Sequence, residues 1–299
     1  MRVAAVDCGT NTIKLLIGDL PHVDVREMRM IRLGQDLDRT GRIADEALER
    51  AFAAIEEYAE LIRDHDVPPD RVRFVATSAS RDAANADEFV AGVHRLLGVD
   101  PEVVSGDVEA ALAFDGAVRN LREAPTTPVL VVDIGGGSTE LILGAAAPEA
   151  AYSMDIGSVR LHERHLHSDP PTRAEVDACV DDIERHLDAC PVSPAEAATV
   201  VGVAGTVTSV AAGVLCLTAY DRDATDQAEL PVDDVHALVD RLVAMTVDER
   251  LALPWLHPGR ADVIGAGALI LSRVLRRSSV EHLVVSEADI LDGIAWSLV

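Results

Sequence analysis

Two short segments of the chain, residues 7–12 and 133–139, carry the same order of side chains, and each could hold a phosphate group. In both, an apolar run leads to an aspartate, then to glycine, then to hydroxyl or amide residues. Glycine lets the backbone approach an anion closely, so that successive N–H groups converge on one phosphate. The sequence therefore predicts two phosphate-binding loops; the alternative is two coincidental glycine-rich β-turns. The predicted contacts are Gly9, Thr10, Asn11, Gly135, Gly136, Gly137, Ser138 and Thr139.

Carboxylates flank these loops at positions that suit a divalent cation. Asp7 precedes the first loop, Asp133 precedes the second, and Glu140 follows the second directly. A Mg²⁺ ion that keeps several of its waters is held by one or two carboxylates. We therefore predict metal ligands at all three positions. For Glu140 the alternative is a solvated residue at the start of a strand.

Two basic residues lie close to the predicted loops or strand ends. Lys14 is the only lysine among 26 basic residues, and it either contacts a substrate phosphate or is a strand residue with a solvated head. Arg81 is predicted on a serine-rich loop that leaves a strand, where its planar fork suits a second phosphate. The alternative for Arg81 is an ion pair with Asp82 or Asp87.

A further anion site is predicted at Gly205 and Thr206, which join a strand to a helix. The N–H groups and the dipole at a helix N-terminus favour negative charge. Arg260 either lines the substrate channel or caps the helix that follows it.

The elements around the two loops exclude the common nucleotide-binding motifs. Residues 3–6 and 129–132 are short, apolar and rich in valine, as buried strands are. Residues 13–18 and 141–144 are strand-like and too short for a helix. A Walker loop or a dinucleotide fingerprint needs a helix directly after its glycines, so the loops are predicted to close β-hairpins instead.

Such a duplicated strand–loop–strand unit resembles the superfamily of acetate and sugar kinases and actin-like ATPases. The resemblance implies an α/β fold of two actin-like (ribonuclease H-like) domains with the active site in a cleft between them. The Pro/Thr-rich segment 123–128 predicts domains at residues 1–124 and 125–299, with the last helix able to pack back across the first domain. The other predicted elements are helices at 45–64, 87–97, 107–122, 173–187 and 288–298 and strands at 72–77, 103–104, 200–204 and 282–285.

Composition limits the partners. The net charge of -25 over 299 residues repels nucleic acid and anionic membranes, so neither is an expected partner. We expect a cytoplasmic protein, because the chain starts with a strand and has no uncharged apolar stretch of about 18 residues. The four cysteines lack zinc spacing and are predicted to be reduced, with Cys8 filling a tight turn. The histidines at 162, 165 and 167 do not share a helical face and are predicted on a solvated surface.

Eight runs together resemble the exopolyphosphatase and guanosine pentaphosphate phosphohydrolase family, in the family's order over nearly the whole chain. They are residues 7–12, 32–34, 76–83, 105–110, 133–140, 205–209, 258–264 and 285–288. The resemblance implies Mg²⁺-dependent removal of terminal orthophosphate from inorganic polyphosphate, with guanosine pentaphosphate as the close alternative substrate. A monovalent cation such as K⁺ is a further candidate cofactor, and a homodimer is a candidate assembly that the sequence does not establish.

The resemblance also points to Glu109 as the general base. Glu109 matches the glutamate just before the alanine in the family's Ser-Gly-x-Glu-Glu-Ala motif, while Val108 replaces the first glutamate of that motif. From the residues alone, the preferred interpretation of Glu109 is a first-turn acid favoured by the helix dipole. Two more distant functions are a sugar- or acetate-type kinase, for which no adenosine pocket is identifiable, and a non-catalytic alarmone-binding sensor. The intact Glu109, Asp133 and Glu140 argue against the sensor.

Overall fold

The computed structural model describes residues 1–299 and consists of two compact units. Unit 1 comprises residues 1–116 and 290–299, and unit 2 comprises residues 117–289. The division falls near the end of helix α5 (Gly106–Arg119). The domain boundary expected between residues 124 and 125 lies in the loop that follows this helix.

Unit 1 is built on a five-stranded sheet in the order β3-β2-β1-β4-β5. Strands β1, β2 and β3 form an antiparallel meander, and β4 and β5 run parallel to β1. The strands are β1 (Val3–Cys8), β2 (Thr12–Asp19), β3 (His22–Met30), β4 (Val72–Ala76) and β5 (Glu102–Val103). The helices are α1 (Leu37–Thr40), α2 (Asp45–Asp64), α3 (Ser78–Asp82), α4 (Ala86–Leu97), α5 and α13 (Ile290–Trp296), with a 3₁₀ turn at Pro69–Arg71.

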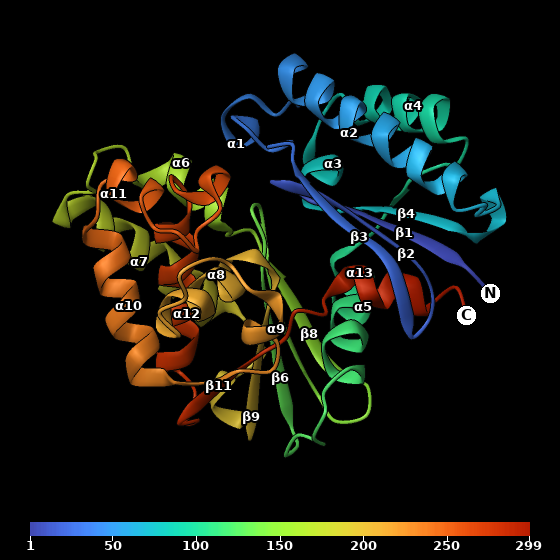
Figure 1. The fold of residues 1–299 in the computed structure, drawn as a ribbon. Helices are drawn as coiled ribbons and strands as arrows, with labels where there is room; N and C mark the ends of the chain where they lie inside the picture. The colour runs from blue at the N-terminus through green and yellow to red at the C-terminus, as the bar shows by residue number, and fades with distance from the viewer. The chain divides into compact units, whose positions relative to one another are not determined.

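The core of unit 1 follows from the alternation of side chains along β1. Ala4, Val6 and Cys8 belong to the buried cluster that also contains the apolar stripe of α2. Asp7 points to the opposite face of the sheet because successive strand residues alternate. Helix α13 packs on β1 and β2, so the end of the chain completes unit 1. Figure 1 shows α2 and α4 on one side of this sheet and α13 on the other.

Polar contacts also tie the C-terminal segment into unit 1. Arg26 of β3 makes a bidentate ion pair with Asp292 of α13. Arg71 donates to the carbonyl oxygen of Leu298 at 2.9 Å. These contacts join residues more than 200 positions apart in the sequence.

Unit 2 is built on a six-stranded sheet in the order β10-β11-β9-β6-β7-β8. Strands β6, β7 and β8 form an antiparallel meander, β9 and β11 run parallel to β6, and β10 is antiparallel to β11. The strands are β6 (Val129–Ile134), β7 (Thr139–Gly144), β8 (Pro148–Met154), β9 (Thr199–Val203), β10 (Glu229–Pro231) and β11 (His282–Val285). The helices are α6 (Ser158–His165), α7 (Arg173–Ala189), α8 (Ala204–Val214), α9 (Arg222–Thr225), α10 (Val232–Ala244), α11 (Val247–Leu251) and α12 (Ile264–Arg276), with 3₁₀ turns at Pro194–Glu196 and Pro258–Arg260.

The two sheets repeat one topology. The order β3-β2-β1-β4-β5 in unit 1 corresponds to β8-β7-β6-β9-β11 in unit 2, with the same strand directions, and β10 extends the second sheet. The larger core of unit 2 lies between its sheet and α7, α8, α10 and α12 (Figure 1). A meander followed by parallel strands, present twice, is the actin-like (ribonuclease H-like) α/β fold that the sequence predicted.

The structure confirms both hairpins and every helix and strand predicted from periodicity, with ends that shift by a few residues. Strands β3 and β8, the third strands of the two meanders, were not predicted from the sequence. Both lie at sheet edges and are partly exposed, so charged residues and alanines interrupt their apolar alternation. The loop expected around Arg81 is the short helix α3. No helix is long and apolar enough to cross a membrane.

Candidate active site

The two glycine loops are closed by the same backbone hydrogen bond. The N–H of Gly9 donates to the carbonyl oxygen of Thr12 at 2.9 Å, and the N–H of Gly135 donates to that of Ser138 at 3.0 Å. The hairpins are therefore duplicates in geometry as well as in sequence.

The segment after each meander holds the carbonyl groups of its loop. The N–H of Gly34 donates to Thr10 at 2.9 Å, and the N–H of Ser158 donates to Gly135 at 2.9 Å. In a trans peptide the C=O and the following N–H point in opposite directions. The N–H groups of Asn11 and Gly136 therefore point away from the supporting segments, as an anion-binding loop requires.

Gly157 allows the second of these contacts to form. A Cβ atom at this position would lie 2.4 Å from the carbonyl oxygen of Gly136 and 2.7 Å from the nitrogen of Gly137. Only glycine lets the start of α6 approach the loop so closely. The Thr139 side chain is fully buried and donates its hydroxyl hydrogen to Ile156, so it supports the loop from within.

The two hairpins differ in the charges of the side chains that face each other across the strands. In the first, Asp7 lies opposite Lys14, and Lys14 Nζ is 3.3 Å from Asp7 Oδ2. Because the Lys14 side chain is only 17 % exposed and contacts this carboxylate, the alternative of a solvated head is wrong. In the second hairpin, the equivalent positions hold Asp133 and Glu140. A positive and a negative group thus face each other in unit 1, and two carboxylates face each other in unit 2.

The carboxylate pair of unit 2 lies inside the protein. Asp133 is 7 % exposed and Glu140 is 1 % exposed, so the alternative of a solvated Glu140 is also wrong. Ser153 of β8 donates a hydrogen bond of 2.7 Å to Glu140 Oε1. Directly opposed residues on antiparallel strands have Cβ atoms about 4.5–5.5 Å apart. Two carboxylates on such neighbouring positions could hold a magnesium ion together. No group of three or more histidine, cysteine, aspartate or glutamate residues is placed to hold a metal alone.

Glu109 and Arg81 form an ion pair in unit 1. Glu109 is buried in the first turn of α5, and Arg81 Nη1 donates to its Oε2 atom at 3.2 Å. The same nitrogen donates to the carbonyl oxygen of Val104 at 3.0 Å. The alternative to a phosphate contact was an ion pair of Arg81 with Asp82 or Asp87, and the carboxylate that Arg81 contacts in the structure is Glu109. The pair forms because β4 and β5 are parallel neighbours, so the elements after them, α3 and α5, begin side by side.

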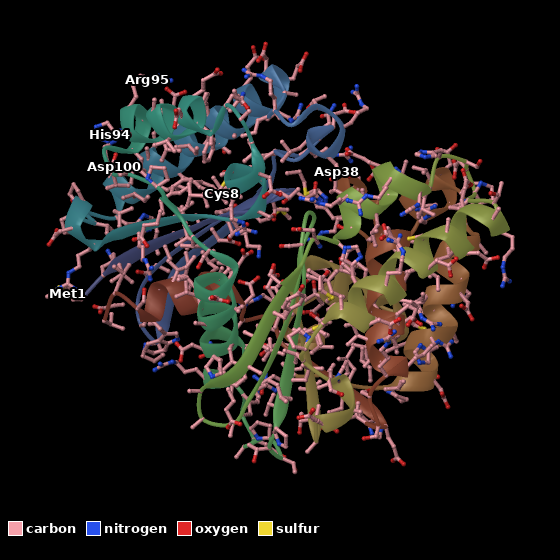
Figure 2. All side chains as sticks on the ribbon, turned by 180° about the vertical axis from the view of Figure 1, so that it is seen from behind. Met1, Cys8, Asp38, His94, Arg95 and Asp100 are labelled. Atoms are coloured by element: carbon pink, nitrogen blue, oxygen red, sulfur yellow. The ribbon has the colours of Figure 1, made fainter.

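Helix α3 also links this ion pair to the first loop. The hydroxyl groups of Thr10 and Ser78 are 2.8 Å apart and buried, and the N–H of Thr77 donates to the carbonyl oxygen of Cys8. Cys8 is buried at the end of β1, and burial raises the pKa of its thiol well above the usual value. Figure 2 labels this residue among the side chains of unit 1. The prediction that Cys8 is a packed small residue is confirmed.

The predicted anion site at Gly205 and Thr206 lies at the start of α8, next to the end of β6 through the pairing of Asp133 with Val203. Ala204 adopts a φ of 66°, a left-handed conformation that marks a sharp turn between β9 and α8. The Arg260 guanidinium lies against Gly205 and donates to Ser209 Oγ at 3.2 Å. Burial lowers the pKa of Arg260 from its ordinary value. Arg260 was expected to line the substrate channel or to cap the helix that follows it, and in the structure its side chain lies at the start of α8.

The histidine cluster is less solvated than predicted. His165 Nε2 lies 2.7 Å from Asp182 Oδ2, and the His165 side chain is only 17 % exposed. Asp182 of α7 is itself buried and also accepts from Arg164 and Arg185. The prediction of a solvated surface is therefore wrong for His165, because α7 packs against α6 and buries that face.

Each unit thus contains one glycine hairpin loop closed by the same hydrogen bond, and the fold is that of the actin-like superfamily. The chain belongs to the Ppx/GppA phosphatase family, which matches residues 17–299. It is therefore an enzyme of a phosphatase family.

Similar proteins cover the whole length of the chain. It is 48% identical to "Exopolyphosphatase 2" of Mycobacterium tuberculosis, over 99% of this chain and 98% of the relative. The crystal structure of an "exopolyphosphatase-like protein" is 45% identical, with a TM-score of 0.96 over 99% of this chain and 98% of the other. A family member from Aquifex aeolicus is 31% identical, with a TM-score of 0.83 over 99% and 97% of the two chains.

Proposed function

We propose that this protein is an exopolyphosphatase that hydrolyses the terminal phosphoanhydride bond of inorganic polyphosphate and releases orthophosphate. The observation that carries the proposal is the duplicated hairpin in which the second copy replaces a lysine–aspartate pair by two buried, opposed carboxylates. The name of the relative that is 48% identical supports the same substrate.

Mg²⁺ is the cofactor that the second hairpin fits, and Asp133 and Glu140 would hold it. When bound, the ion neutralises charge on phosphate oxygens. Two opposed carboxylates repel each other when both are ionised, and a divalent cation beside them offsets this repulsion. Asp7 was predicted as a third ligand. Since its partner is Lys14, we assign Asp7 instead to orienting the Lys14 ammonium group, which supplies a positive charge from the protein itself.

Binding of a polyanion to a chain of net charge -25 needs local positive groups. Unit 1 offers Lys14, Arg81 and the outward N–H groups of the first loop, and unit 2 offers the second loop and the start of α8. Charge-assisted contacts of this kind position a phosphate more strongly than neutral hydrogen bonds do.

Glu109 is the proposed general base. A general base must be ionised and must lie within reach of the attacking water. The pairing with Arg81 favours the ionised carboxylate, because a nearby positive charge stabilises the charged form. The first-turn position on α5 adds the favourable field of the helix N-terminus.

Phosphate release from polyphosphate, guanosine pentaphosphate and ATP, measured in parallel with and without Mg²⁺, tests the proposal. We expect Mg²⁺-dependent release that is fastest from polyphosphate. Faster release from guanosine pentaphosphate would move the assignment to that substrate, and phosphate transfer from ATP to an acceptor without hydrolysis would indicate a kinase. Repeating the polyphosphate assay in K⁺ and Na⁺ buffers tests the candidate monovalent cofactor.

A further inference from the structure

We infer that Arg81 is a positioning residue that acts through Glu109: one end of its guanidinium fixes the carboxylate of the base while the other end receives a substrate phosphate. This inference rests on the proposed function and adds to phosphate binding a second role for Arg81, the orientation of the Glu109 carboxylate. It follows from the hydrogen bonds that Arg81 makes and from those that it leaves unused.

The Nη1 group of Arg81 is fully engaged with the protein. It donates to the carbonyl oxygen of Val104 at 3.0 Å and to Glu109 Oε2 at 3.2 Å, which uses both of its hydrogens. The Nε and Nη2 groups make no hydrogen bond to the protein and carry the three remaining donors. These three donors form the edge of the guanidinium that matches two phosphate oxygens.

Burial supports this division of the guanidinium. The Glu109 side chain is 8% exposed, whereas the Arg81 side chain is 28% exposed. Nε and Nη2 of Arg81 lack a partner in the protein and are not buried, so this edge of the guanidinium is accessible to a ligand. An arginine that served only as a structural ion-pair partner would gain nothing from three exposed and unused donors.

The backbone fixes the position of Arg81 before any substrate binds. Arg81 lies in the short helix α3, which starts two residues after the end of β4 and is attached to the first loop by the contact of Ser78 with Thr10. The Val104 carbonyl oxygen, which accepts from Arg81, belongs to the residue after β5. The orientation of the guanidinium is thus set by two neighbouring strands, and little of it has to be ordered by the ligand.

A rigid planar group that contacts both the base and the phosphate fixes the distance between them. This is the geometry that in-line attack of water on phosphorus needs, and misplacement by about 1 Å costs about 10²-fold in rate. A lysine at position 81 would keep the positive charge, but a single ammonium on a flexible chain does not reproduce two opposed sets of donors. The two functions of Arg81 are therefore separable by substitution.

The test is a double-mutant cycle on the full chain with Arg81→Ala, Arg81→Lys and Glu109→Gln, measuring kcat, KM and the pH profile of kcat/KM with the substrate that the wild type hydrolyses. We expect Arg81→Lys to lower kcat about 10–100-fold with a KM within about threefold of wild type. We expect both Arg81 variants to move the acid limb of the profile to higher pH, because the charge that favours ionised Glu109 is lost or displaced. Arg63→Ala on the exposed face of α2 is the matched control and should change none of these values.

In the Glu109→Gln background, Arg81→Ala should lower kcat by less than about threefold further and still raise KM, because a residue that acts through the base has no base left to position. An equal fold-loss of kcat in both backgrounds, or an acid limb that does not move in either Arg81 variant, would overturn the inference. Thermal unfolding of each variant identifies misfolding, and Arg81→Lys keeps the test valid if Arg81→Ala does not fold.

The wild-type arm alone tests the proposed function: a wild type that releases no phosphate from any of the three substrates would refute that proposal, and the inference with it. An active wild type with additive mutants would refute only the inference.

Discussion

Glu140→Gln is the substitution that tests the magnesium assignment most directly. It removes one negative charge, keeps the shape of the side chain and leaves an amide oxygen to accept from Ser153. Glu140 is 1% exposed, so an effective dielectric constant of about 20 is more suitable than that of water. A unit charge and a divalent cation 4 Å apart then interact by about 8 kcal/mol. Since the ion keeps waters and the amide keeps a dipole, we expect only about a quarter of this to be lost, and about 2 kcal/mol corresponds to about 30-fold.

The measurement is steady-state phosphate release at saturating substrate over a titration of Mg²⁺. The concentration for half-maximal activity should rise about 30-fold in Glu140→Gln, and a similar rise is expected for Asp133→Asn. Glu149→Gln, an exposed change on strand β8 of the same sheet, is the control and should leave the curve in place. Without Mg²⁺, Glu140→Gln should melt no lower than wild type, because it relieves the repulsion of two opposed carboxylates. Unchanged titration curves for both variants would place the metal elsewhere, and a much lower melting temperature would give Glu140 a structural role.

Three further predictions concern the base, the phosphate contact and the pH dependence of stability. Glu109→Gln should lower kcat about 10²–10⁴-fold and keep polyphosphate binding, and a variant with near wild-type turnover would remove Glu109 as the base. Arg81→Ala should weaken binding of long polyphosphate by about 1.5–3 kcal/mol, against about 0–1 for the exposed Arg63→Ala, as measured by equilibrium binding. Equal losses would indicate diffuse charge. Burial raises the pKa of Asp182, but hydrogen bonds from His165 and Arg164 outweigh burial and bring it below its ordinary 3.8. The stability that Asp182 contributes is therefore present above about pH 4 and lost as pH falls through the lower folded value, so Asp182→Asn should flatten the loss of unfolding free energy in acid.

The hairpins, the long helices and the family resemblance could be predicted from the sequence because their signals are local. Residues 3–6 and 129–132 are apolar runs, each followed by an aspartate and, two residues after it, by a glycine. The helix over 45–64 repeats its apolar residues at helical spacing. The third strands were missed for the opposite reason. Strands β3 and β8 lie at sheet edges, where each has one neighbouring strand and is partly exposed, so the alternation of apolar and polar residues is less regular.

The candidate residues themselves were identified from the sequence, because the types and order of aspartate, glycine and hydroxyl residues in a short loop indicate what the loop could bind. Their partners were not. Hairpin register decides that Asp7 lies opposite Lys14 and that Asp133 lies opposite Glu140. The geometry of the turn sets this register, and a shift of one residue would move these side chains to the other face of the sheet.

The pairing of Arg81 with Glu109 required the tertiary structure, because the two residues are 28 positions apart and meet only where the parallel strands β4 and β5 end side by side. The sequence by itself determined which groups could bind phosphate, metal and a proton. The packing of strands that are distant in the chain decided which of these groups form ion pairs or face a like charge. The chemistry of a side chain is a property of its residue, whereas its electrostatic partner depends on the fold.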